Sequence, residues 1–102
     1  MKVLFLIRGG NVPAEKQEEN MKEWGGYTEE LKKKGAYLSG LPLAGGKVVS
    51  TDKVKDYKSS DMDIAGYYEL EVDSMENAVM AAQMAPNIKH GGNIEIREEM
   101  AM

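Results

Sequence analysis

Hydrophobic residues near the start of the chain form an unbroken run. Residues 3–7 read Val-Leu-Phe-Leu-Ile and lie between Lys2 and Arg8. A strand that is apolar at every position, and not only at alternate ones, is typically covered on both faces. The run is too short for a membrane span or for the core of a signal peptide. We therefore predict a central β-strand.

A helical pattern follows. Pro13 suits the first position of a helix, and four apolar residues then recur at intervals of three or four, which places them on one helical face. They are Met21, Trp24, Tyr27 and Leu31. Gly25-Gly26 interrupts this pattern, so either the helix bends there or Thr28 starts a new turn. Lys32-Lys33-Lys34 and Gly35 are typical of a helix C-terminus.

The middle of the chain predicts less regular structure. Residues 36–41 and 47–51 are predicted as two short strands, and the turn between them contains Pro42 and Gly45-Gly46. Residues 52–63 are polar and lack a period. They are long enough for a loop or for an arm that folds over a pocket.

Residues 64–72 alternate in polarity and predict a strand with two different faces. One face consists of Ile64, Gly66, Tyr68, Leu70 and Val72. The opposite face contains Glu69 and Glu71, which we expect at the rim of an interface or in solvent.

A second helix is predicted after this strand. Asp73, followed by Glu76, resembles a capping box, and Pro86 ends the helix. Its apolar face consists of Met75, Ala78, Val79 and Ala82, with Met80 and Met84 on the opposite side. Residues 93–98 alternate again and predict the last strand.

The order strand, helix, strand, strand, strand, helix, strand predicts an α+β fold. Two right-handed crossover units around one antiparallel sheet give a ferredoxin-like sandwich with one extra hairpin strand. Its length of 102 residues predicts a single domain. Two helices cover only one face of such a sheet, whereas the first strand is apolar on both. We therefore predict that a second copy covers the other face, in a homodimer.

Composition excludes several kinds of chemistry. A net charge of −4 argues against nucleic acid as a partner, because such binding depends on clustered Lys and Arg. The chain contains no cysteine and a single histidine, so disulfides, thiolate nucleophiles and multi-histidine metal sites are not expected. We predict no metal, since the acidic residues lack the loop pattern of a calcium site, and no cofactor, since neither phosphate-binding glycine motif occurs. A cytoplasmic protein without a membrane partner fits this composition.

Three segments together resemble one family. They are MKEWGGYTEELKKKGAYLSGLPLAGGKVVS, IAGYYELEVDSMENAV and APNIKHGGNIEIREEM. In this order and spacing they are similar to the YCII-related proteins, also called the DGPF-domain family. The resemblance covers nearly the whole chain, and it implies a dimeric α+β barrel.

The sequence departs from this family at two places. Val54-Lys55-Asp56-Tyr57 stands where the named branch carries Asp-Gly-Pro-Phe, so only the aromatic ring is kept. Some relatives carry a histidine on the first helix and an aspartate before the proline, proposed as an acid/base pair. The matching positions hold Trp24 and Ala85, which transfer no proton. That mechanism is therefore not implied for this chain.

Aromatic residues are the best candidates for a ligand pocket. Trp24 and Tyr27 share a helical face, and Tyr68 lies on the side of its strand that faces the helices. Such rings line clefts between sheets and helices, although packing in the core explains the two helical residues equally well.

Four polar candidates complete the set. Arg8, beside a glycine turn and a helix start, could hold a carboxylate or phosphate; the alternative is an ion pair with a neighbouring acid. His90, Asp52 and Tyr68 are candidates for acid/base roles. For His90 the alternative is an exposed turn residue.

Three functions remain open. The first is a small-molecule enzyme with a pocket between sheet and helices; the resemblance to the YCII-related proteins implies a lyase, isomerase or dehalogenating type. The second is a non-catalytic dimeric module that binds or senses a small ligand. The third is an accessory protein that acts through its surface.

Overall fold

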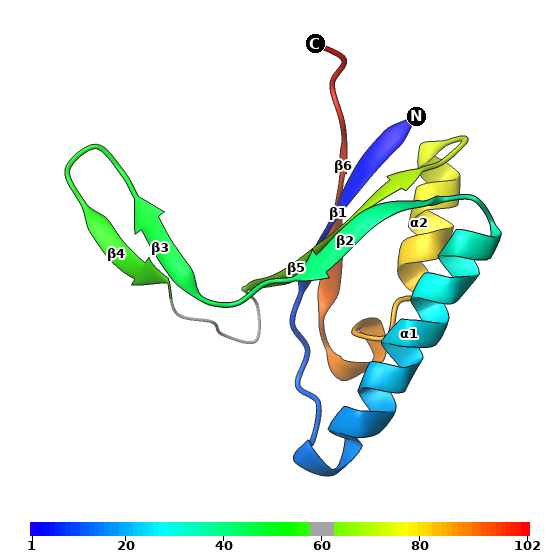
Figure 1. The fold of residues 1–102 in the computed structure, drawn as a ribbon, viewed down its shortest axis with the longest axis horizontal. Helices are drawn as coiled ribbons and strands as arrows, with labels where there is room; N and C mark the ends of the chain where they lie inside the picture. Colours follow the sequence, from blue (N-terminus) through cyan, green and yellow to red (C-terminus); the bar gives the residue numbers. More distant parts are fainter. Residues whose placement is uncertain (58–62) are drawn as a thin grey trace.

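The computed structural model describes residues 1–57 and 63–102 (Figure 1). Its elements are β1 (Lys2–Arg8), η1 (Ala14–Lys16), α1 (Gln17–Lys33), β2 (Tyr37–Pro42), β3 (Gly46–Val49), β4 (Val54–Tyr57), β5 (Ile64–Glu71), α2 (Met75–Gln83), η2 (Ile88–His90) and β6 (Asn93–Glu98). Four strands form an antiparallel sheet in the order β2-β5-β1-β6. Both helices pack on one face of this sheet (Figure 1). The ferredoxin-like α+β prediction is confirmed.

Alternate residues of β1 face the two sides of the sheet. Val3, Phe5 and Ile7 are buried beneath the helices, where they form a core with Leu31, Leu70, Ala78 and Ala82. Leu4 and Leu6 point to the opposite face and are half-buried. The strand is therefore apolar on both sides, as its sequence indicates, although the helices cover only one of them.

Helix α1 runs without a break through Gly25 and Gly26. Trp24, Tyr27 and Leu31 face the core as expected. The prediction for Met21 was wrong, because its side chain is 74% exposed. It lies on the polar first half of the helix, which extends past the sheet (Figure 1).

Helix α2 differs from its prediction in two ways. Ser74, and not Asp73, is the N-cap, since its hydroxyl accepts a hydrogen bond of 3.1 Å from the Asn77 amide. Ala78 and Ala82 are buried as predicted, whereas Met75 and Val79 of the predicted apolar face are 36% and 41% exposed. The small alanines bring the helix so close to the sheet that only a narrow stripe of its surface is covered.

A hairpin of β3 and β4 lies outside the main sheet. The sequence predicted one extra strand at residues 47–51 and no strand within residues 52–63. The structure instead pairs Gly46–Val49 with Val54–Tyr57. β4 was missed because the sequence Val-Lys-Asp-Tyr contains a single β-branched residue and no clear alternation. Residues 58–62 of the segment predicted as irregular lie outside the described residues.

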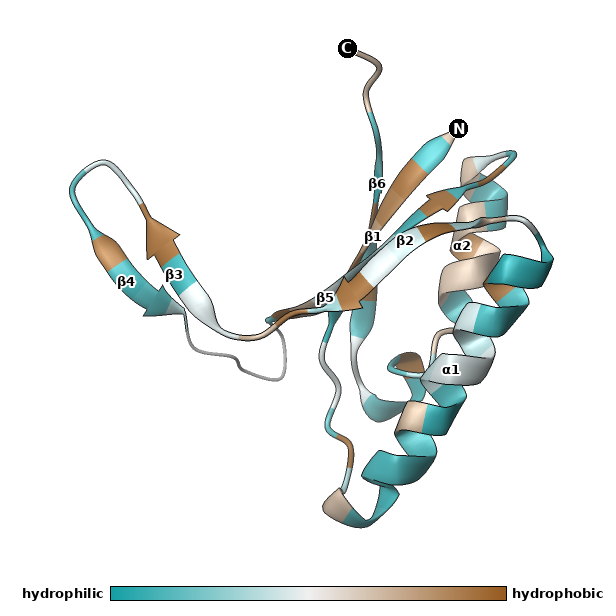
Figure 2. Cartoon of the chain, viewed as in Figure 1, coloured by the Kyte–Doolittle hydropathy of each residue, from teal (hydrophilic) through white to brown (hydrophobic). Residues whose placement is uncertain are grey.

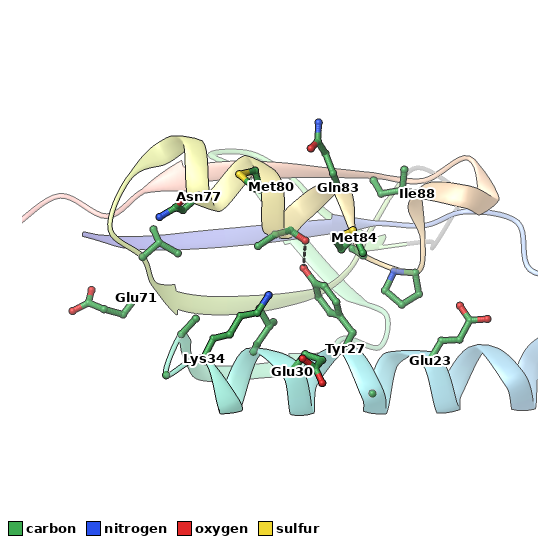
Figure 3. Close-up of a pocket in the computed structure, with 18 of the residues that line it drawn as sticks. Glu23, Tyr27, Glu30, Lys34, Glu71, Asn77, Met80, Gln83, Met84 and Ile88 are labelled. Carbon is green, nitrogen blue, oxygen red and sulfur yellow. Dashed lines mark hydrogen bonds between the residues drawn. The ribbon is translucent and has the colours of Figure 1, made fainter.

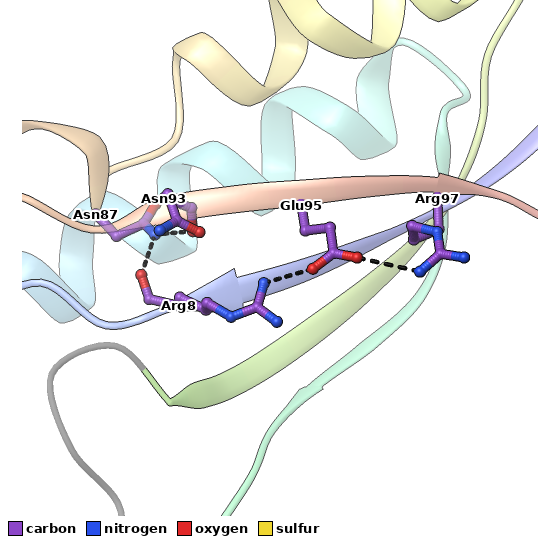
Figure 4. Close-up of polar contacts among 5 residues, drawn as sticks. All are labelled: Arg8, Asn87, Asn93, Glu95 and Arg97. Carbon is purple, nitrogen blue, oxygen red and sulfur yellow. Dashed lines mark hydrogen bonds and ion pairs between the residues drawn. The ribbon is translucent and has the colours of Figure 1, made fainter.

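Asn87 joins the ends of β1 and β6. Its side-chain amide donates hydrogen bonds of 2.9 Å to the Arg8 carbonyl and 3.0 Å to the Asn93 carbonyl (Figure 4). The residue is 4% exposed, so both carbonyls are satisfied inside the protein. This amide fixes the turn that follows η2 against the start of the loop after β1.

Candidate functional site

Four aromatic rings meet between α1 and the sheet. Trp24 lies with its ring centre 5.8 Å from that of Tyr27 and 6.0 Å from that of Tyr68, in edge-to-face geometry. Tyr27 and Tyr68 stack at 6.1 Å, and Tyr37 of β2 packs edge-on against Tyr68 at 5.7 Å. We call these four residues the aromatic cluster. Such arrangements match the preferred geometries of aromatic pairs.

A glycine on β2 makes room for this cluster. Gly40 pairs with Tyr68 across the two strands, so a side chain there would point toward the same face. A Cβ atom at Gly40 would lie 2.2 Å from Cδ1 of Tyr68 and 2.8 Å from the Tyr67 carbonyl oxygen. Only glycine therefore allows the Tyr68 ring to lie against β2.

The hydroxyl groups of the cluster are used within the protein. The Thr28 hydroxyl donates to the Trp24 carbonyl at 2.9 Å and lies 2.6 Å from the Tyr68 hydroxyl. A hydroxyl has one proton to donate, so Tyr68 is the donor in the second hydrogen bond. The Tyr27 hydroxyl donates to the Ala81 carbonyl at 2.6 Å, which links α1 to α2.

Burial shifts the ionisation of two of these phenols. Desolvation raises the pKa of Tyr27 far above its ordinary value, with a smaller contribution from Tyr68. Desolvation also raises the pKa of Tyr68, with a smaller contribution from Tyr37. Both groups stay protonated at neutral pH and act as hydrogen-bond donors rather than as bases.

We expect the folded state to lose stability as the pH rises above about 10, the ordinary pKa of tyrosine. Because the folded pKa of Tyr27 is raised, its contribution is fully present below that pH and is lost as the pH rises through the folded pKa. The loss is at most about 1.4 kcal/mol per pH unit for each such group. Urea unfolding between pH 8 and 11 measures it. Tyr27→Phe should show a shallower decline than the wild type, and an identical decline would contradict the assignment.

A groove lies between α1 and α2, beside the aromatic cluster (Figure 3). Its volume is about 1060 Å³. Tyr27, Leu31 and Ala81 contribute to its lining, and the exposed side chains of Met80 and Met84 project from α2. The groove is open on one side to solvent, and its interior is mainly apolar.

Gly26 forms part of the α1 wall of this groove. A Cβ atom at Gly26 would meet nothing within 4 Å, and the same is true at Gly25. The two glycines differ in position, because Gly26 lines the groove and Gly25 does not. The missing side chain at Gly26 thus widens the groove.

Charged residues also line the groove, and most of them are acids: Glu23, Glu30, Glu71 and Asp73, with Lys34 and Lys89 as the cations. An ion pair between Lys89 and Glu23 joins the η2 segment to α1 at one end. Lys34 lies toward the other end and extends into the space between the helices (Figure 3). Its ammonium group makes no hydrogen bond or ion pair with any residue that the structure describes. It is therefore available to a polar group of a ligand.

Arg8 lies on the opposite face of the sheet. Its guanidinium donates to Glu95 at 2.8 Å, and Arg97 donates to the other oxygen of the same carboxylate at 3.2 Å (Figure 4). Hydrogen bonds from Arg8 and then from Arg97 lower the pKa of Glu95. Arg8 is thus paired with a neighbouring acid, which is the alternative that the sequence left open.

The remaining candidates lie apart from the aromatic cluster. His90 ends η2 and borders a small polar pocket of about 300 Å³ with Asn20 and Lys16. Asp52 is exposed in the turn between β3 and β4. The structure therefore brings together Trp24, Tyr27 and Tyr68, but not Arg8, Asp52 and His90.

Tyr37 of the aromatic cluster and Thr28, which hydrogen-bonds to it through Tyr68, were missed from the sequence. Thr28 follows Trp24 by four positions and so lies on the same helical face, a spacing that could have revealed it. Tyr37 gave no such signal, since the register of β2 shifts between Tyr37 and Ser39. Its orientation depends on that irregularity.

Within residues 1–57 and 63–102, no three His, Cys, Asp or Glu side chains gather in a way that could hold a metal ion. Of the helices described, none is long and apolar enough to cross a membrane.

Comparison with known proteins gives a family and a fold. The sequence model of the YCII-related domain matches residues 1–101. No curated protein sequence matches the chain. A solved structure of 5-chloro-2-hydroxyhydroquinone dehydrochlorinase (TftG) from Burkholderia phenoliruptrix AC1100, in complex with 2,5-dihydroxybenzoquinone, is similar with a TM-score of 0.65. The sequences are 19% identical, and the match covers 100% of this chain and 96% of that one.

Proposed function

Since the chain belongs to the YCII-related family, we propose that it is a homodimer that binds a small, flat, largely apolar molecule in the groove between α1 and α2. The observation that carries this proposal is the groove itself. Its volume of about 1060 Å³ is at the upper end of the roughly 300–1,000 Å³ found for small-molecule pockets. An apolar interior with a few polar groups at its ends is typical of such pockets.

The groove offers contacts suited to a ring compound. Met80 and Met84 have flexible, polarisable side chains that adapt to flat ligands and make favourable contacts with aromatic rings. The ring of Tyr27 contributes a rigid surface, because its hydroxyl is held by the Ala81 carbonyl. Lys34 supplies one cationic group for a polar substituent. These contacts favour ligand binding over catalysis. The phenols of Tyr27 and Tyr68 are protonated and so do not act as bases.

A catalytic role is the second candidate, and one observation favours it. The structural neighbour TftG, which shares the fold, is a dehydrochlorinase whose structure holds a ring compound. An enzyme of this kind would release chloride from a chlorinated hydroquinone. Incubation of the protein with 5-chloro-2-hydroxyhydroquinone and measurement of chloride tests this second candidate. Chloride release no faster than in buffer would remove it.

The homodimer is supported by the face of the sheet that lacks helices, which we call the open face. Leu4 and Leu6 lie at its centre beside Tyr67. Arg8 and Arg97 carry positive charge on this face, and Glu69 lies opposite Leu4 on β5. A two-fold interface must be complementary to itself. A face with an apolar centre and charges of both signs meets that requirement.

We expect Gly26→Phe to block the groove and to weaken ligand binding at least tenfold. The added ring would occupy the α1 wall, where a Cβ atom has free space. Gly25→Phe is the matched control, because it makes the same change one residue away and outside the lining. Fluorescence titration with the neutral flat dye Nile red, and calorimetry with 2,5-dihydroxybenzoquinone, measure the difference. Equal binding by both variants would show that the groove is not the site.

A further inference from the structure

The hairpin of β3 and β4, called the arm below, stands apart from the rest of the chain. Its strands pair with each other from Gly46 opposite Tyr57 to Val49 opposite Val54, and with no other described strand. Figure 1 shows the arm beyond the ends of β2 and β5, on the side of the sheet away from the helices. The radius of gyration is 14.7 Å, whereas a compact chain of this length has about 13 Å.

Apolar side chains of the arm are exposed to solvent in a single subunit. Val49 and Val54 lie opposite each other, so both project from one face of the hairpin. They are 72% and 67% exposed. In Figure 2 the strand ends next to the tip of the arm are hydrophobic, whereas the turn that joins them is hydrophilic. An isolated two-stranded hairpin is at best marginally stable in water, so this face requires a cover.

The charged residues on that face of the arm lie near its base, so the part near the tip is apolar. Lys47 pairs with Asp56 on the same face as the two valines, nearer the base of the arm. The pair satisfies both charges within the arm and leaves Val49 and Val54 as an apolar end. An arm that carried such residues only to remain in water would be prone to aggregate through its strand edges.

We propose that the arm packs against a second copy of the chain, an inference that rests on the homodimer proposed above. A partner whose sheet covers Leu4 and Leu6 occupies the side from which the arm projects (Figure 1). The position of the arm therefore places its apolar end beside that partner. Two-fold symmetry makes the contact reciprocal, so that each arm clasps the other subunit.

Val49→Asp tests this contact. The side chain is exposed in a single subunit, so the substitution leaves the protomer folded, but it places a charge in the proposed contact. We expect the dissociation constant of the dimer, measured by sedimentation equilibrium, to rise at least tenfold. Met21→Asp, which makes the same charge change at an exposed site on α1, should leave that constant unchanged.

A label on the arm gives an independent readout. The sequence has no cysteine, so Val54→Cys carries a single environment-sensitive dye. Its emission should shift to the blue over the same concentration range in which the mass doubles.

The outcomes separate the two proposals. If the protein is a dimer but Val49→Asp has the wild-type dissociation constant, or the dye emission stays constant, the arm does not contact the partner and the homodimer stands. If the wild type stays at 11.3 kDa at every concentration, the homodimer is overturned and the arm contact with it.

Discussion

Gly40→Ala should destabilise the protein by about 3 kcal/mol, the upper part of the range for overpacked cores. The new methyl group would lie 2.2 Å from the ring of Tyr68 and 2.8 Å from a backbone oxygen. Neither is the free end of a flexible side chain, so β2 or the whole ring must move. Movement of Tyr68 also breaks its hydrogen bond with Thr28. Urea unfolding measures the change in free energy.

Gly46→Ala is the matched control for this substitution. Gly46 also lies in a strand, but a Cβ atom there meets nothing within 4 Å. We expect its unfolding free energy to stay within about 0.5 kcal/mol of the wild type. In a Tyr68→Ala background, Gly40→Ala should cost less than in the wild type, because one of its two clashes is gone. A mild effect of Gly40→Ala in the wild-type protein would contradict the packing described for the cluster.

Leu6→Asp should weaken the dimer at least a hundredfold. Leu6 lies on the open face beside Tyr67 and Glu95. A carboxylate in the centre of that interface would lose its hydration without gaining a partner, a cost of several kcal/mol. It would also be placed next to the carboxylate of Glu95. Sedimentation equilibrium of Leu6→Asp and of the wild type measures the two dissociation constants.

Arg97→Glu is a second variant that separates a weaker dimer from an unfolded protomer. Its side chain is exposed on the same face, so the substitution should leave the protomer intact. It removes a cation that the self-complementary interface would use, and we expect at least a tenfold weaker dimer. Circular dichroism should show wild-type helix content for both variants. A dissociation constant unchanged in both would contradict the use of the open face.

Hydrophobic periodicity was enough to predict the main sheet, both helices and the gathering of Trp24, Tyr27 and Tyr68. Of these three residues, which were expected to contact a ligand, Tyr27 lines the groove and the other two do not. The unbroken run at residues 3–7 indicated a strand with two apolar faces, and β1 has them. The spacing of Trp24, Tyr27 and Leu31 placed these residues on the buried face of α1. Alternation in β5 directed Tyr68 toward the helices. Each of these predictions depends on the spacing of apolar residues within one strand or helix, which can be read directly from the sequence.

Other features depend on contacts between distant segments. Met21 fits the helical repeat but lies where α1 has passed the edge of the sheet, so it is exposed. The role of Gly40 follows from its register with Tyr68, which no local pattern encodes. The lining of the groove combines Gly26 of α1 with Met80 and Met84, which are distant in sequence. For Arg8 the sequence left anion binding and an ion pair open, and the register with β6 gives it Glu95 as a partner.

The most direct test of the account is the mass of the wild-type protein in dilute solution. Sedimentation equilibrium at pH 7, over micromolar and lower concentrations, should give twice the chain mass of 11.3 kDa and a reversible fall to the single mass on dilution. This result would support a second copy on the open face. A single mass of 11.3 kDa at all concentrations, with the open face in contact with water, would contradict it.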